Sequence, residues 1–203
     1  MRKLCYRNDG VVIKQLVLQD PLLEELFKEP SEITITLTDD YFLSIVSAIV
    51  GQQLSGKVAE VIYSRVNTLF EENITASKLA NASFDDLRAC GLSGRKIEYL
   101  QSLANHMIKG ELDFSHIDEM SNQDIINMLV KIKGIGPWTA EMFLLFSIGR
   151  ENVFSVLDLG LRNGLMKLYK QELAPEKMLE ISEKWHPYKS VVSHYLWRYN
   201  AKK

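Results

Sequence analysis

The chain has 203 residues, of which 46% are hydrophobic and 25% are charged, and its net charge is −2. This balance is typical of a soluble globular protein, and the length suits one large domain or two small lobes that share a cleft. Two distant cysteines, Cys5 and Cys90, exclude a disulfide framework and a four-cysteine metal or iron–sulfur site, and they fit a reducing cytosol. We expect no signal peptide and no membrane segment, because no apolar run approaches the roughly 20 residues that cross a bilayer.

Helical periodicity dominates the chain. The first helix is predicted over 13–27, with a restart at Asp20-Pro21, where aspartate can cap and proline suits the first turn. Alternation over 32–37 predicts a short extended segment, and Thr38 is the expected cap of the next helix. Further helices are predicted over 40–51, 55–70, 75–80, 83–89, 93–108, 121–131, 137–147, 158–169, 175–184 and 188–199. The predicted fold class is therefore all-α.

The most informative segment is KIKGIGPWTA, residues 131–140. Two helical patterns meet there at Gly134-Ile135-Gly136-Pro137. Glycine permits left-handed or very close backbone, and proline at the first helical position loses no hydrogen bond. The pattern predicts a tight hairpin whose amides, at a helix N-terminus, attract a phosphate. An ordinary helix connection with a glycine C-cap fits the same residues.

Asp158 follows the apolar run Val153–Leu157 and precedes a helical pattern. Taken by itself it is an N-cap, because aspartate at that place accepts a hydrogen bond from the first helical turn. Capping is compatible with catalysis, since a cap fixes the direction of the carboxylate.

The order of several motifs resembles a known family. Residues 121–147 resemble the helix-hairpin-helix motif of DNA repair proteins, and Asp158 lies where the hairpin-Gly/Pro-Asp superfamily of base-excision glycosylases has its aspartate. Residues 49–57, 90–100 and 185–198 resemble further segments of the alkylbase glycosylases. The resemblance runs from about residue 20 to 200.

The resemblance implies a two-lobed helical glycosylase fold with a central cleft. One lobe is expected to contain both termini (1–38 plus 155–203), and the other (39–154) to contain the hairpin at about 121–147. Little or no N-terminal β domain is expected, because only about 19 residues precede the helical part.

The resemblance also implies an activity, the removal of alkylated purines such as 3-methyladenine and 7-methylguanine in base excision repair. Cleavage of an N-glycosidic bond develops an oxocarbenium-like charge, which Asp158 would stabilise while it orients or activates water. A cationic alkylated base leaves readily without a second carboxylate. Relatives that also cut the strand carry a Schiff-base lysine at the position of Trp138, so we expect a monofunctional glycosylase without AP-lyase activity.

The target base must leave the duplex to reach Asp158, and aromatic faces hold such a base well. Trp138 and Trp197 are the candidate aromatic residues, with core packing as the structural alternative for both. Met142 stands where a bacterial relative has a pocket tyrosine, and Gln53 is a further candidate for the base pocket.

The candidate DNA contacts lie at the hairpin and at a predicted wedge loop. The wedge position, a leucine in a bacterial relative, falls on Gly94, so Ser93 or Leu92 would have to take its place. Arg95 and Lys96 suit phosphates but equally suit a solvated helix face. The full set of expected DNA contacts is Gly134, Gly136, Thr139, Ser93, Gly94, Arg95 and Lys96.

The family pattern implies no required cofactor. A monovalent cation, Na⁺ or K⁺, is expected at the hairpin on the carbonyls of Val130, Ile132 and Gly134.

The expected partner is double-stranded DNA with damaged bases, bound by a monomer. The compartment would be the cytoplasm, with the nucleoid, in a bacterium, and the nucleus in a eukaryote. The net charge of −2 counts mildly against nucleic acid, although phosphate binding by backbone amides needs no basic surface. Three alternatives stay open: a glycosylase for oxidised or mismatched purines, a non-catalytic DNA-binding module, and a helical protein–protein adaptor.

Overall fold

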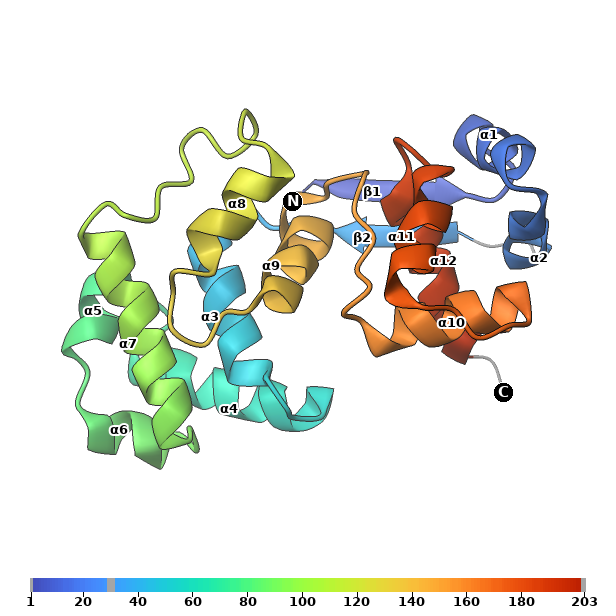
Figure 1. Ribbon diagram of the computed structural model, residues 1–203. Coiled ribbons are helices and arrows are strands. Elements are labelled where there is room, and N and C mark those ends of the chain that lie inside the picture. The colour runs from blue at the N-terminus through green and yellow to red at the C-terminus, as the bar shows by residue number, and fades with distance from the viewer. Residues whose placement is uncertain (1, 29–31, 202–203) are drawn as a thin grey trace. The chain divides into compact units, whose positions relative to one another are not determined.

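The computed structural model describes residues 2–28 and 32–201 (Figure 1). The chain divides into two compact units, a first unit of residues 1–39 and 144–203 and a second unit of residues 40–143. The predicted all-helical fold class is confirmed, because a single two-stranded sheet is the β-structure within the described ranges.

The division differs from the expected boundary at residues 154 and 155. Residues 144–154 belong to the first unit, because Phe154 lies in its buried core. The backbone of Val153 is also hydrogen-bonded to serine side chains of that unit.

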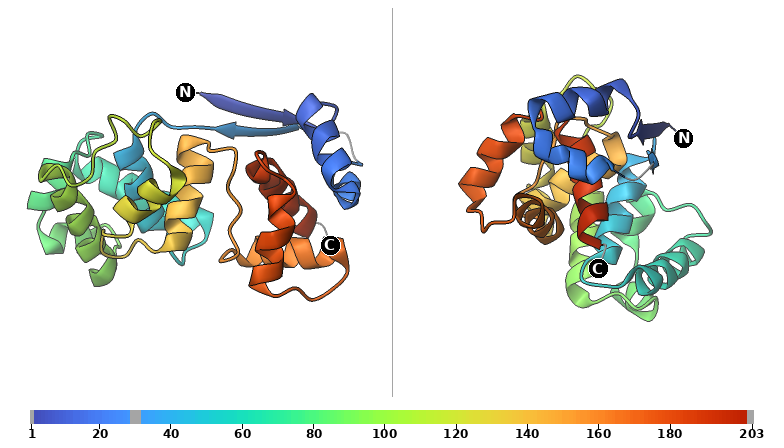
Figure 2. Two further views of the ribbon diagram at one scale, coloured as in Figure 1. Left: turned by 45° about the horizontal axis from the view of Figure 1, so that its top comes forward. Right: turned by 90° about the vertical axis from the view of Figure 1, so that its right-hand side faces the viewer.

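The first unit begins with a two-stranded sheet, of which the sequence predicted one strand. Strand β2 (Glu32–Thr36) coincides with the predicted extended segment and pairs antiparallel with β1 (Lys3–Arg7), which the sequence did not indicate (Figure 2). In β1 the side chain of Tyr6 is buried and the flanking side chains are more exposed, so this strand carries a weak alternating pattern. Three short elements connect the strands: α1 (Val11–Gln19), η1 (Pro21–Leu23) and α2 (Glu24–Phe27).

The C-terminal part supplies most of the first unit's helices. They are η2 (Leu144–Ile148, a π-helical turn), α10 (Leu159–Tyr169), α11 (Pro175–Glu183) and α12 (Lys189–Ala201). Helices α10 and α12 pack closely at Gly164, where an added Cβ would lie 2.9 Å from the backbone oxygen of Leu196. Fully buried Trp185 and Tyr195 are the largest side chains of this core.

Asp20 joins three parts of the first unit. It confirms the predicted restart, because its Oδ1 accepts from the amide of Leu22 at 3.3 Å and so caps η1. Its Oδ2 accepts from Trp185 Nε1 at 3.0 Å and from the Tyr169 hydroxyl. Burial and the Asp20 carboxylate together raise the pKa of Tyr169. Asp20 is itself only 3% exposed, so these donors replace the water that a buried carboxylate loses.

The second unit consists of seven helices in its described residues, and they follow the predicted ones closely. Helix α3 is capped by Asp40, whose Oδ1 accepts from Leu43 N at 2.9 Å, so the prediction of Thr38 as the cap was wrong by two residues. The bounds are α3 (Tyr41–Gly51), α4 (Gly56–Leu69), α5 (Ala76–Asn81), α6 (Phe84–Ala89), α7 (Gly94–Ile108), α8 (Asn122–Leu129) and α9 (Pro137–Phe143).

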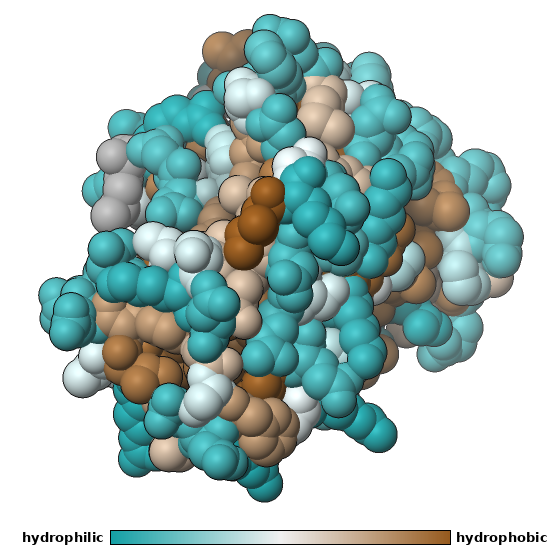
Figure 3. Space-filling model, turned by 90° about the vertical axis from the view of Figure 1, so that its left-hand side faces the viewer, coloured by the Kyte–Doolittle hydropathy of each residue, from teal (hydrophilic) through white to brown (hydrophobic). Residues whose placement is uncertain are grey.

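Helix α7 is the helix against which α3, α5 and α6 pack. Its buried side chains recur at helical spacing: Ile97, Leu100, Leu103 and Ala104. Helix α4 behaves differently, because it buries Val66 while Val58 and Val61 stay 45% and 51% exposed. Figure 3 shows that apolar residues form brown patches among hydrophilic ones on one face of the molecule. Among the described helices, none is long and apolar enough to cross a bilayer.

Replacement of Asp20 by alanine should destabilise the protein by about 2–4 kcal/mol, because Trp185 Nε1 and the Tyr169 hydroxyl would be left without their acceptor. Urea unfolding followed by circular dichroism measures this change. Asp9→Ala is the matched control, because Asp9 is exposed and pairs with Arg7 on the surface. A variant Asp20→Ala as stable as Asp9→Ala would contradict the role of Asp20.

A second prediction concerns His194, which is 7% exposed and whose pKa burial lowers to about 4. Since the folded state disfavours its protonation, the contribution of neutral His194 is complete above pH 6.5 and is lost as the pH falls towards 4. We expect this residue to account for a loss of ~3 kcal/mol over that window. Unfolding free energies measured from pH 7 to 4 should fall less steeply in His194→Gln than in the wild type. Equal slopes would contradict the prediction.

Candidate functional site

Asp158 stands at the start of α10 with its carboxylate held from two sides. Its Oδ1 accepts from the amide of Leu161 at 2.8 Å, as expected of an N-cap. The same oxygen accepts from Trp197 Nε1 at 2.8 Å, a contact from α12. Two donors on one oxygen fix the plane of this half-buried carboxylate. The structure thus brings two predicted site residues, Asp158 and Trp197, into direct contact.

A glycine makes this contact possible. At Gly160 an added Cβ would lie 2.9 Å from Trp197 Cδ1 and 3.1 Å from Asp158 Oδ1. Gly164, one turn later, allows the close approach to α12 described above. Two glycines at i and i+4 therefore form a flat face on α10 against which the C-terminal half of α12 packs.

The segment before Asp158 is fixed by two buried serines of α12. Ser190 Oγ accepts from Val153 N at 3.0 Å and donates to the carbonyl of Arg150 at 2.5 Å. Ser193 Oγ donates to the carbonyl of Val153 at 3.1 Å. Helix α12 consequently positions both the chain that leads to Asp158 and the indole that binds Asp158.

Trp197 belongs to a cluster of aromatic rings. Its centroid lies 5.3 Å from that of Phe146, with the planes at 29°, and 5.5 Å from that of His194. Phe146 and His194 meet edge to face at 5.3 Å. Phe146 is 44% exposed, so part of this cluster is open to solvent next to Trp197, the partner of Asp158.

Phe146 was not among the predicted site residues. It lies in η2, where the predicted helix over 137–147 changes to a π-helical turn. Such turns occur often at functional sites, because the extra residue redirects a side chain. In sequence, one phenylalanine within the apolar run 143–148 looks like part of the core, and only its exposure singles it out.

In the second unit, the predicted hairpin connects α8 and α9. Gly134 has φ of +87°, and a Cβ there would lie 2.1 Å from Cδ2 of Tyr99, so two independent reasons require glycine. The carbonyl of Gly134 accepts from Gln52 Nε2 at 3.0 Å. Lys133 N donates to Ser102 Oγ at 3.2 Å, and Lys133 Nζ pairs with Glu98 at 2.6 Å. The hairpin is therefore held by α7 and by the end of α3.

The predicted wedge loop lies at the start of α7. Ser93 caps the helix, its Oγ accepting from Lys96 N at 3.3 Å, and Arg95 is exposed. Lys96 Nζ donates to the carbonyl of Val50 at 2.7 Å, and burial lowers the pKa of Lys96. Gly94 has room for a side chain, because an added Cβ would lie 3.7 Å from the ring of Phe84. Lys96 thus has a partner within the protein, whereas Arg95 faces solvent.

Four further candidates lie near the hairpin in sequence or at the end of α3. Trp138 (44% exposed) and half-buried Met142 are one turn apart on α9, so both side chains are on one face of that helix. Gln53 is exposed and has φ of +58°, an uncommon conformation for a residue other than glycine. Thr139 is half-buried in the first turn of α9.

Metal ligation by side chains finds no support among the described residues, where no group of three or more His, Cys, Asp and Glu side chains could hold an ion. The hairpin carbonyls are a different kind of site. Ile132 O accepts from Ile135 N at 3.1 Å and Gly134 O accepts from Gln52, and each oxygen keeps a second lone pair.

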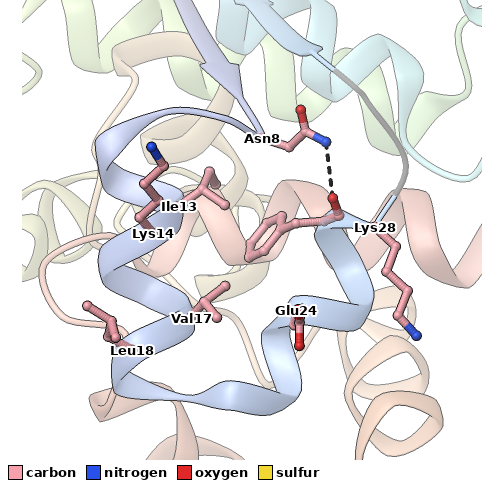
Figure 4. A pocket seen from close by; sticks show the side chains of 8 residues that line it. Asn8, Ile13, Lys14, Val17, Leu18, Glu24 and Lys28 are labelled. Carbon is pink, nitrogen blue, oxygen red and sulfur yellow. Dashed lines mark hydrogen bonds between the residues drawn. The ribbon is translucent and has the colours of Figure 1, made fainter.

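A groove of about 630 Å³ lies between α1 and α2 in the first unit (Figure 4). Asn8 Nδ2 donates to the carbonyl of Phe27 at 3.0 Å across one end of it, and Lys14 and Lys28 stand on its rim. None of the predicted site residues lines this groove, so we assign it no part in the site.

Comparison with known proteins identifies the family. The model of the HhH-GPD superfamily of base excision DNA repair proteins matches residues 46–187. DNA-3-methyladenine glycosylase 1 of Schizosaccharomyces pombe is 36% identical over 159 residues, which are 76% of this chain and 70% of that protein. The Bacillus subtilis protein YfjP is 32% identical over 87% of this chain, and the match spans 64% of its own length.

Solved structures agree with this assignment. The DNA-3-methyladenine glycosidase of Bacillus halodurans is 38% identical with a TM-score of 0.89, and the match covers 100% of this chain and 94% of that one. The S. pombe enzyme Mag1, solved in complex with abasic DNA, is 29% identical with a TM-score of 0.78 and coverages of 93% and 96%. The family model, the sequence relatives and the folds all agree, and the chain therefore belongs to the HhH-GPD superfamily of base excision DNA repair proteins.

Proposed function

We propose that this protein is a monofunctional DNA glycosylase that hydrolyses the bond between deoxyribose and an N-alkylated purine of the 3-methyladenine or 7-methylguanine type. The observation that carries the proposal is the carboxylate of Asp158, fixed by Leu161 N and Trp197 Nε1 beside a partly exposed aromatic cluster. Relatives named DNA-3-methyladenine glycosylase support the choice of base.

Asp158 acts on the sugar. As the glycosidic bond breaks, its electron pair leaves with the base, and positive charge develops at C1′ and the ring oxygen. The ionised Asp158, whose direction is set in advance, stabilises that charge without reorganisation. Water adds at C1′ and gives up a proton, and an abasic site remains. Because the alkylated purine is already cationic, it departs as a neutral base and needs no acid.

The pocket is proposed to bind the base by stacking. The partly exposed ring of Phe146, which stacks on Trp197, suits an electron-poor ring through stacking and cation–π attraction. From the second unit, Trp138, Met142 and Gln53 remain the proposed base contacts. Trp138 also carries the proposal of base release without strand cleavage, since an indole forms no Schiff base.

DNA is proposed to bind through the hairpin amides. Gly134, Gly136 and Thr139 would face one phosphate, and Ser93, Gly94 and Arg95 would contact the duplex at the start of α7. Lys96 is a weaker candidate than Arg95, because it already donates to Val50. Solved relatives in complex with DNA support this partner. We also propose that the protein acts as a monomer. Its place of action would be the compartment that contains the DNA of the cell.

A cation at the hairpin is the remaining proposal. The carbonyls of Val130, Ile132 and Gly134 are hard oxygen donors of the kind that Na⁺ or K⁺ accepts, and such an ion would add positive charge beside the bound phosphate. Ile132 O and Gly134 O each already accept one hydrogen bond within the protein, from Ile135 N and from Gln52 Nε2, so an ion would use their second lone pairs.

Replacement of Asp158 by asparagine should lower base release by about 100-fold or more, because the isosteric amide keeps an acceptor for both N–H groups but has no negative charge. Methylated duplex DNA is incubated with each protein, and released bases are separated by chromatography. DNA affinity should change by less than about threefold, because the hairpin is untouched. Release of 3-methyladenine by this variant at the wild-type rate would refute the catalytic assignment, and strand cleavage by the wild type without heat or alkali would refute the monofunctional one.

Replacement of Gly160 by alanine should separate Trp197 from Asp158, because the new Cβ would lie 2.9 Å from the indole. We expect single-turnover excision to slow by about tenfold, as for the loss of one charge-assisted hydrogen bond. Gly56→Ala is the matched control, because nothing lies within 4 Å of a Cβ at that position. The same rate in both variants would show that the Trp197–Asp158 contact is dispensable.

A further inference from the structure

Gln52 links two segments that are 82 residues apart in the chain. It is the C-cap residue of α3, and its Nε2 donates to the carbonyl of Gly134 at 3.0 Å. A carbonyl only accepts hydrogen bonds, so the amide nitrogen and not the amide oxygen of Gln52 must face it. The hydrogen bond therefore has one direction, and it needs a hydrogen-bond donor of this length at position 52.

The hydrogen bond acts on one particular peptide group. Gly134 O and Ile135 N belong to the same planar unit, and Ile135 N donates to Ile132 O at 3.1 Å. Gln52 holds the carbonyl side of that plane, and the hairpin itself holds the amide side. With both sides held, rotation of this peptide plane is blocked, so the backbone between Gly134 and Ile135 keeps one orientation.

Gly134 is the residue in the hairpin where such a restraint matters. Its φ of +87° is accessible to glycine, which has the largest backbone freedom of all residues. The ring of Tyr99 packs against one side of its Cα, and the Gln52 amide binds the carbonyl. A flexible residue is thereby confined to one conformation before any ligand binds.

The end of α3 is itself anchored. Lys96 Nζ donates to the carbonyl of Val50 at 2.7 Å, and Leu54 N donates to the carbonyl of Gly51 at 3.1 Å. Gln53 then turns the chain with φ of +58°. Because these contacts fix the backbone next to Gln52, its side chain can transmit that fixed position to the hairpin.

We propose that Gln52 is a positioning residue that preorganises the hairpin for a DNA phosphate. This inference rests on the proposed function of the hairpin and goes beyond it by naming the side chain that sets its geometry. Preorganisation lowers the ordering cost of binding, and it leaves the chemistry at Asp158 unchanged. Loss of the Gln52 amide therefore weakens DNA affinity and spares the excision rate at saturating DNA.

The test compares Gln52→Ala with Gln101→Ala. Gln101 is a matched control, because its Nε2 also donates to a backbone carbonyl in this unit, that of Ala82 at 3.5 Å. The probes are an undamaged duplex and one with a tetrahydrofuran abasic analogue, and binding is followed by fluorescence anisotropy at fixed salt. We expect affinity for both duplexes to fall about three- to tenfold in Gln52→Ala, and less than about twofold in Gln101→Ala. Single-turnover excision at saturating DNA stays within about twofold of the wild type.

The variant Gln52→Glu should show a pH-dependent DNA affinity, which a general loss of stability would not produce. At pH 8 the carboxylate repels the carbonyl of Gly134, and affinity falls further than in Gln52→Ala. As the pH decreases towards about 4.3, the ordinary pKa of a glutamate, an increasing fraction of the carboxyl is protonated and regains the donor, and the ratio of variant to wild-type affinity rises. The pH profile of Gln52→Ala relative to the wild type stays flat.

Three results would overturn the inference. They are unchanged affinity in Gln52→Ala, equal losses in Gln52→Ala and Gln101→Ala, and an affinity ratio for Gln52→Glu that does not change with pH. A failure of the proposed function would look different from these three results. A wild-type protein that binds DNA but releases no alkylated base would refute the proposed glycosylase activity and would leave the role of Gln52 untouched. Amide hydrogen exchange at Ile135 and Gly136 without DNA tests Gln52 independently, since exchange there should be faster in Gln52→Ala than in Gln101→Ala.

Discussion

The catalytic role proposed for Asp158 depends on a carboxylate that is held still, and much of the first unit meets that requirement. One oxygen accepts from its own helix and from the indole of Trp197, so its direction depends on the distance between α10 and α12. Gly160 and Gly164 set that distance, and serines of α12 fix the chain that leads to Asp158. A charge already aimed at a developing cation needs no reorganisation when the bond breaks, and electrostatic stabilisation of this kind supplies most of the rate enhancement in many enzymes.

The second unit applies the same principle to backbone groups. The hairpin carries its proposed function on peptide amides, which explains how a chain with a net charge of −2 can suit DNA. Amides hold a phosphate well only when their peptide planes are fixed. Tyr99 and Gln52 confine Gly134, and Ser102 holds the neighbouring amide of Lys133. Both proposed sites therefore depend on neighbouring side chains that hold the carboxylate or the hairpin backbone in place.

The aromatic cluster connects stability with the proposed specificity. Burial lowers the pKa of His194 well below its ordinary value, so this histidine adds no positive charge beside Trp197 and Phe146 near neutral pH. A cationic alkylated base would be repelled by a protonated histidine and attracted by neutral aromatic rings. The same burial that makes the fold sensitive to acid thus suits the site to its proposed ligand.

The sequence by itself determined the helices, most of their caps, the hairpin and the position of Asp158, because these depend on local spacing and on glycine, proline and capping residues. The predicted cap of α3, Thr38, was wrong, because Asp40 is a stronger acceptor and lies nearer to the start of the helix. Local patterns could not predict strand β1, the inclusion of residues 144–154 in the first unit, or the exposure of Val58 and Val61, because each follows from what packs against the segment. For the same reason only the tertiary structure decided that Trp197 donates to Asp158, that Phe146 is an exposed member of the cluster, and that Lys96 and Gln52 bind backbone carbonyls within the protein. A motif specifies which chemical groups are present, and packing between distant segments specifies where they point.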